Sequence, residues 1–295
     1  MAYLLLIFTT LFWAGNFVTA RGIHEDFPPL TMSFLRWGLA LLIISPFFIS
    51  RLRKQWPVIR QHLPLLCLLS ILGVACFNSF VYVGLQTTMA TNATLMQSAV
   101  PITILVICSL FLKEQVTFKQ WLGVFISLAG VITLISRADL DVLISLSFNK
   151  GDLWIFAAVI SWSIYSVVLR WKPRELDGFT FFGFTVMVGV LAISPFALWE
   201  YSTGTIPHWN EQTGSAIVYM AICPSILSYT FWNRGVAELG AAKAGLFIHL
   251  MPLFGLVLSV LFLGEQVQTF HFVGMGLIFS GIYLAILSRQ IDQLK

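Results

Sequence analysis

Long apolar segments, separated by short polar or charged stretches, make up most of this chain. The apolar residues run continuously instead of alternating with a period of two, which predicts helices and not the strands of a membrane barrel. Each segment approaches the roughly 20 residues that a helix needs to cross a bilayer. Ten such spans are predicted, at about 3–20, 30–50, 64–86, 91–112, 119–136, 151–171, 178–198, 213–234, 241–263 and 269–288.

The composition supports a membrane protein and excludes a soluble fold. Of the 295 residues, 58% are hydrophobic and only 10% are charged, against about 45–50% and about 25% in a typical soluble domain. Mean hydropathy is +0.87. Ten spans use about 200 residues, so we predict an all-α integral membrane protein with short loops.

The positive charges predict how the chain is oriented. If the N-terminus is cytoplasmic, 13 of the 17 Lys and Arg residues fall on the cytoplasmic side and three on the other, while Arg36 lies within a span. This bias predicts that both termini are cytoplasmic. The first segment reads as a retained span and not as a signal peptide. The net charge of +4 predicts no nucleic-acid binding, because no basic run lies on a polar helix face.

The chain contains an internal repeat. ISPF occurs at 44–47 and again at 193–196, and PITILVICSLFLKEQV (101–116) aligns with PLFGLVLSVLFLGEQV (252–267) with nine of 16 positions identical. We therefore predict two five-helix units, residues 1–140 and 150–290. Because five is odd, the second unit enters the membrane from the opposite side, as in the inverted-topology repeats of transporters. The alternative is a duplicated bundle with no transport role.

Several motifs resemble the EamA family of the drug/metabolite transporter superfamily. They are LFWAGNFV (11–18), FLRWGLALLI (34–43) and two copies of a Pro…LFL-x-EQV…Gly…Gly block. Lys113 departs from the small residue that is more common in the family. The resemblance implies a ten-helix secondary transporter, commonly an exporter of amino acids or other small metabolites, with a central cavity between the repeats.

Polar and aromatic residues in the middle of spans are the candidate solute ligands, because polar groups in hydrocarbon face the bundle interior or a wet cavity. The predicted cavity has aromatic walls and a few hydrogen-bonding groups, as small-molecule pockets do. The alternative is that these side chains only pack helices or face lipid. The candidates are Trp13, Asn16, Arg36, Asn78, Tyr82, Gln97, Ser98, Trp162, Tyr165, Tyr229 and His249.

Two of these candidates, Arg36 and His249, have clearly different alternative roles. Arg36 is predicted about 9 Å below the outer surface, where it attracts a solute carboxylate, holds a backbone carbonyl or extends to the lipid headgroups. His249 is a solute ligand, a protonation switch or a neutral packing residue. Paired prolines, Pro101 and Pro252, are expected to kink their spans or free a carbonyl.

The function predicted is a secondary carrier in the cell (inner) membrane that exports small metabolites. Amino acids or related amines are the first candidates for its substrate. A nucleotide-sugar or drug carrier is the nearest alternative, and an intramembrane lipid-modifying enzyme is the alternative of a different class. The sequence contains no P-loop, no HExxH and no Cys/His cluster, so we expect no cofactor, no metal and no catalysis. The expected partners are a small solute and membrane lipid, with the protein a monomer or a weak homodimer.

Overall fold

The structure, a computed structural model, describes residues 1–88, 90–144, 149–204, 206–263 and 268–292. Ten helices within these residues are long and apolar enough to span a membrane, and the described chain contains no strand. The predicted all-α membrane fold is confirmed. The GEQV stretch at 264–267 lies outside the described residues.

Some spans are single helices and others are interrupted. In chain order they are α1 (Ala2–Gly22); α2 (Pro29–Gln61); α3 (Leu63–Ser70), η1 (Ile71–Cys76) and α4 (Phe77–Thr87); α5 (Ala90–Gln97) and α6 (Val100–Phe111); α7 (Phe118–Ser136); α9 (Lys150–Val168) and η2 (Leu169–Trp171); α10 (Gly178–Ser202); α11 (Glu211–Met220), η3 (Ala221–Leu227) and α12 (Ser228–Leu239); α13 (Ala241–Leu246), η4 (Phe247–Leu250) and α14 (Met251–Leu263); and α15 (Thr269–Asp292). A short helix, α8 (Leu140–Ile144), lies between the two halves.

The second helix is much longer than its apolar segment. It was predicted to end near residue 50, but α2 continues to Gln61 and has 33 residues. At about 1.5 Å per residue it is roughly 50 Å long, which exceeds the hydrocarbon core of about 30 Å. The prediction placed the end of the helix where the apolar segment gives way to charged residues such as Arg51 and Lys54. These residues are good helix formers, so the helix continues beyond the membrane.

Residues that correspond in the two halves contact each other in the middle of the molecule. A residue touches its own repeat counterpart only where both lie near the pseudo-two-fold axis, so these contacts locate that axis. The pairs are Trp13 and Trp162, with ring centroids 5.0 Å apart; Asn78 and Tyr229, with Nδ2 donating to the hydroxyl at 2.8 Å; and Ser98 and His249, with the carbonyl oxygen 2.9 Å from Nε2.

The fifth and tenth spans, α7 and α15, pack closely through glycines. A Cβ atom at Gly123 would lie 2.5 Å from the carbonyl oxygen of Gly281, and one at Gly130 would lie 2.7 Å from that of Gly274. No side chain fits at such distances, so only glycine allows this approach. The four glycines therefore pack helices within one chain.

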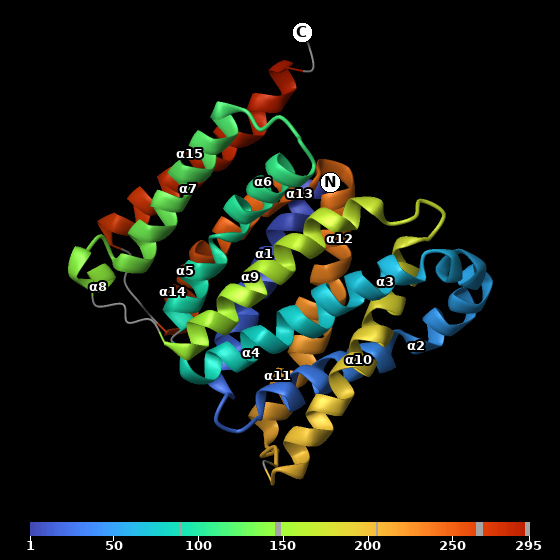
Figure 1. The fold of residues 1–295 in the computed structure, drawn as a ribbon. Helices are drawn as coiled ribbons and strands as arrows, with labels where there is room; N and C mark the ends of the chain where they lie inside the picture. The colour runs from blue at the N-terminus through green and yellow to red at the C-terminus, as the bar shows by residue number, and fades with distance from the viewer. Residues whose placement is uncertain (89, 145–148, 205, 264–267, 293–295) are drawn as a thin grey trace.

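Three groups of helices stand side by side (Figure 1). The pair α7 and α15 forms one side, the pair α2 and α10 forms the other, and the remaining spans lie between them. The start of α1 and the end of α15 lie at the same end of the bundle, at the top of Figure 1. We call this the terminal end and the opposite one the distal end.

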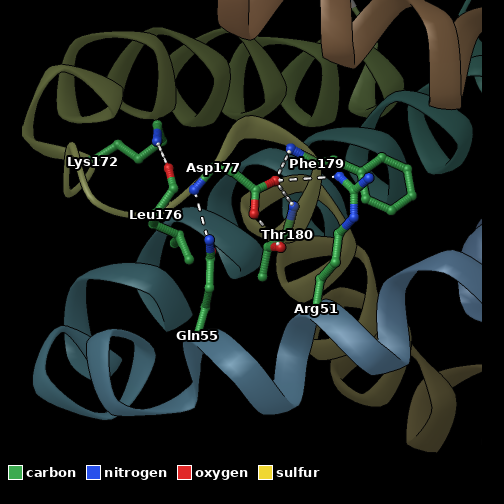
Figure 2. A network of polar contacts seen from close by, with 7 residues as sticks. All are labelled: Arg51, Gln55, Lys172, Leu176, Asp177, Phe179 and Thr180. Atoms are coloured by element: carbon green, nitrogen blue, oxygen red, sulfur yellow. Dashed lines mark hydrogen bonds and ion pairs between the residues drawn. The ribbon is translucent and has the colours of Figure 1, made fainter.

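At the terminal end, the connection into α10 is attached to the extension of α2 (Figure 2). Asp177 caps α10: its carboxylate accepts the backbone N–H groups of Phe179 and Thr180, at 3.0 and 2.9 Å, and the Thr180 hydroxyl at 2.6 Å. Arg51 of α2 lies 3.9 Å from this carboxylate, and Gln55 Oε1 accepts the Asp177 N–H at 3.2 Å. Partial burial acts to raise the pKa of Asp177, but these hydrogen bonds and the Arg51 charge outweigh it and hold the pKa below its usual value.

Lys172 forms hydrogen bonds at the other end of the same connection. Its ammonium group donates to the carbonyl of Leu176 and, at 3.1 Å, to that of Pro173. Burial lowers the pKa of Lys172, although the carboxylates of Asp177 and Glu175 act in the opposite direction. The hydrogen bonds at both ends of the 172–177 segment fix how α9 leads into α10.

Candidate functional site

Arg36 lies at the centre of the bundle and is only 1% exposed. Its guanidinium donates from Nε to Ser225 Oγ at 2.5 Å, and from Nη1 to Asn78 Oδ1 at 2.9 Å and Asn16 Oδ1 at 3.3 Å. Nη1 also contacts the Tyr82 hydroxyl, which in turn donates to Asn16 at 3.2 Å. These partners come from α1, α4 and η3, so Arg36 joins both halves of the protein and does not extend to the lipid headgroups.

The Arg36 network is built against two wide helical segments at corresponding places in the repeat. Both η1 and η3 are π-helical, and such segments leave carbonyl groups open to other partners and recur at functional sites. Tyr229 donates to the carbonyl of Gly73 at 2.6 Å, and Trp13 Nε1 donates to that of Pro224 at 3.2 Å. The irregular backbone is thereby satisfied by side chains of the candidate site.

A cluster of large aromatic side chains borders this network. Trp162 is its centre, with ring centroids 5.0 Å from Tyr165, 5.3 Å from Tyr229 and 5.4 Å from Trp232. Tyr165 donates to Asn233 Oδ1 at 2.6 Å. Along α9 and α12 these residues lie nearer the terminal end than Arg36 does, so the cluster closes the bundle on that side.

A cavity of about 20 Å³ lies between the network and the cluster, with room for about one water molecule. Six of the eleven predicted ligands line it together. Its lining consists of Trp13, Asn16, Phe17, Arg36, Phe77, Asn78, Val81, Gln97, Trp162, Ile248 and Met251.

The other five predicted ligands lie behind this lining. Tyr82 and Tyr229 hold the polar network, and Tyr165 belongs to the aromatic cluster. His249 is fully buried between the carbonyl of Ser98 and the hydroxyl of Ser127. Because a carbonyl oxygen only accepts, Nε2 carries hydrogen and the ring bridges α7 to the break between α5 and α6.

Sequence reasoning missed the apolar part of the lining. Phe77 and Val81 lie beside Asn78 on one face of α4, and Phe17 follows Trp13 by one turn of α1. Helical spacing from a polar residue was the available signal, but apolar residues are too common in a membrane chain for that signal to select them. Ser225, the partner of Arg36 Nε, was also missed because it lies in the interrupted part of its span.

Larger cavities at the two ends of the bundle differ in how they adjoin this central cavity. A distal cavity of about 340 Å³ lies between α1, α7, α14 and α15, and Phe17 and Met251 line both it and the central cavity. A terminal cleft of about 400 Å³, lined by Arg170, Lys172 and Arg174 among others, shares no lining residue with the central cavity. Of these two, the distal cavity is therefore the one that adjoins the central cavity.

The repeat counterparts of two distal-cavity residues are slightly more buried than those residues themselves. Phe17 and Met251 are 6% and 5% exposed, and their counterparts in the other half, Ser166 and Val100, are both 0% exposed. The two halves therefore differ slightly in packing at these corresponding positions.

Comparison with known proteins is consistent with this geometry. Residues 1–136 and 149–287 each match the EamA-like transporter family. The chain belongs to the EamA-like transporter family. It is 27% identical to the uncharacterized transporter YyaM of Bacillus subtilis (strain 168), with 96% of this chain and 92% of the relative covered, and 27% identical to an uncharacterized transporter of Archaeoglobus fulgidus, with 96% of each covered.

A solved crystal structure has the same fold, with a TM-score of 0.76 over 99% of this chain and 98% of the other, at 20% identity. This EamA-like protein is therefore a multi-pass membrane transporter of a small solute, and its relatives' names do not say which solute.

Proposed function

We propose that this EamA-like protein is a secondary carrier of the cell (inner) membrane that exports small metabolites by alternating access. Amino acids are the first candidates for its substrate. The observation that supports it is the buried cavity on the pseudo-two-fold axis, lined by Arg36 and by Trp13 and Trp162 from opposite halves. A site on the axis is reached from either end when the two halves exchange conformations. We place both termini in the cytoplasm, so that the terminal end is the cytoplasmic one.

The lining favours an amino acid over a simple amine. Arg36 is charged at all accessible pH values, and it repels an ammonium group while attracting a carboxylate. A nucleotide sugar has several phosphate charges, and Arg36 is the one basic side chain among the described cavity residues. A lipid-modifying enzyme gains no support, since the lining offers no acid and base pair. We also propose that the protein binds no nucleic acid and acts as a monomer or weak homodimer.

The test is efflux from cells that overexpress the protein, measured for a panel of metabolites against an empty-vector control. We expect faster efflux of one or more amino acids. Trp13→Ala and Trp162→Ala should lower it about tenfold, because each removes a wall of the cavity and an edge-to-face contact worth about 1 kcal/mol or more.

The control is Trp199→Ala, since Trp199 is 63% exposed and distant from the cavity lining. It should insert and export normally. Normal export by both cavity variants at equal membrane abundance would contradict the proposed site, and absence of efflux for the whole panel would contradict the proposed function.

A further inference from the structure

The positive charge of Arg36 is not neutralised within the described protein. No Asp or Glu of the described chain lies within 4.0 Å of its guanidinium, and its hydrogen-bond partners are the neutral side chains of Ser225, Asn78, Asn16 and Tyr82. Buried charges in proteins are normally paired, and charges within a membrane bundle commonly mark the path of a solute. An anion brought by the solute would supply the missing charge.

The buried side-chain atoms of the lining that have no hydrogen-bond partner among the described residues are donors. Gln97 Nε2 and Trp162 Nε1 are buried and have no hydrogen-bond partner among the described residues. No hydrogen bond joins Nη2 of Arg36 to a described residue either, because its bonds run from Nε and Nη1. The amide oxygens of Asn16 and Asn78 are already occupied by Arg36. A ligand that brings acceptors would therefore satisfy these buried donors.

The remainder of the lining is apolar. Phe17, Phe77, Val81, Ile248 and Met251 surround the polar atoms, so the body of the ligand meets aromatic and aliphatic groups. The lining contains no Asp or Glu among the described residues to receive an ammonium group.

We infer that the group recognised is a carboxylate on an apolar, preferably aromatic, body, and that an amino group on the solute is dispensable. This inference rests on the proposed function and narrows its substrate class from amino acids to organic carboxylates in general. Arg36 Nη2 and Gln97 Nε2 donate to the carboxylate, while Trp162 Nε1 offers a further donor beside the apolar body.

The terminal cleft is charged to suit such a solute. Arg170, Lys172 and Arg174 line it together with Glu114, which contacts Arg170. Clefts lined mainly by one sign of charge concentrate ions of the opposite sign. An organic anion would thus be drawn to the end of the protein from which export begins.

The experiment compares three probes with the same phenyl body by titration calorimetry on the full chain in nanodiscs. 3-Phenylpropionate has only the carboxylate, phenylalanine has both groups and phenethylamine has only the ammonium. We expect 3-phenylpropionate to bind at least as tightly as phenylalanine, and phenethylamine to bind at least tenfold more weakly than either. Binding measurements avoid the passive leak of neutral acids and amines through lipid.

An added negative charge in the lining makes the test specific. Gln97→Glu keeps the side-chain shape and places a carboxylate in the same cavity as Arg36, so it should weaken 3-phenylpropionate binding about tenfold or more and should not weaken phenethylamine. The matched control is Gln212→Glu, the same change at an exposed position in the first turn of α11, where a negative charge is favourable. It should leave all three affinities unchanged.

Arg36→Lys retains the positive charge but loses the planar guanidinium and its paired donors. It should therefore weaken binding of the two carboxylates and leave binding of the amine unchanged.

The inference is overturned if phenethylamine binds as tightly as 3-phenylpropionate, if phenylalanine binds and 3-phenylpropionate does not, or if a folded, monodisperse protein binds none of the three. It is also overturned if Gln97→Glu leaves the order of affinities unchanged. These results are distinct from failure of the proposed function: selective carboxylate binding with no efflux of any metabolite would reject the carrier while retaining the recognition.

Discussion

At the scale of single residues, the site depends on side chains with several simultaneous partners. The Arg36 guanidinium bridges α2 to α1, α4 and η3, so it orders the centre of the bundle and supplies its charge. Asn78 acts in the same way, since its oxygen accepts from Arg36 while its nitrogen donates to Tyr229. Removing such a residue leaves the others buried and unsatisfied, which costs about 1–3 kcal/mol for each neutral group.

His249 is expected to act as a packing residue and not as a proton carrier. In His249→Gln the amide still donates to the carbonyl of Ser98, while the bond with Ser127 is weakened, so we expect a stability loss of about 1 kcal/mol. Transport rates should remain within about twofold of the wild type and should not follow an imposed pH gradient. Flux into proteoliposomes at matched and unmatched pH measures this; a wild-type flux that tracks the gradient and a mutant flux that does not would show that His249 carries the proton.

At the scale of elements, interruptions of the helices occur at corresponding places in the two halves. The π-helical segments η1 and η3 correspond, as do the breaks before α6 and α14, where Pro101 and Pro252 follow. Proline lacks an N–H group and so frees a carbonyl one turn earlier. The middle spans therefore combine regular ends with irregular centres, and the candidate site lies at those centres.

The cap of α10 offers an element-scale prediction. Asp177→Ala removes an N-cap and should lower stability by about 1 kcal/mol at neutral pH, without altering solute binding, because Asp177 lies at the terminal end. Asp177→Asn keeps the cap and loses only the charge.

The pH dependence of this effect has a definite sign. Because the folded-state pKa of Asp177 is lower than its usual value of 3.8, the charged carboxylate stabilises the fold above about pH 4, and this contribution is lost as the pH falls through the folded-state pKa. The difference between wild type and Asp177→Asn in thermal unfolding should therefore shrink below pH 4. A difference that grew with acidity would contradict the contacts in Figure 2.

At the scale of the whole molecule, one sequence pattern is packed in two ways. A distal cavity adjoins α1 and α14, and the corresponding helices α9 and α6 pack against each other. On α9, Ser163 and Ser166 are both 0% exposed, and neither hydroxyl has a hydrogen-bond partner among the described residues. An exchange of conformations between the halves would expose these hydroxyl groups to water.

We therefore predict that Ser166→Cys, in a background without the four native cysteines, is labelled by an impermeant maleimide from the terminal face during transport. Val18→Cys, which lines the distal cavity and is 60% exposed, should be labelled from the distal face. Ala158→Cys, equally buried on α9, serves as the control and should stay unlabelled. If Ser166→Cys behaves like Ala158→Cys while transport proceeds, the exchange of conformations does not open this path.

The sequence alone determined the membrane fold, the approximate spans and the inverted repeat, because composition, segment length and an odd number of helices per repeat are local or countable properties. It also indicated Arg36, since a charge within a span always needs an explanation. Only the tertiary structure decided that Arg36 meets Ser225, that His249 lies behind the cavity and that the distal cavity adjoins the central one. Those facts depend on how each helix is rotated and where it crosses its neighbours, and the apolar periodicity of a membrane helix, nearly uniform around its circumference, does not encode either.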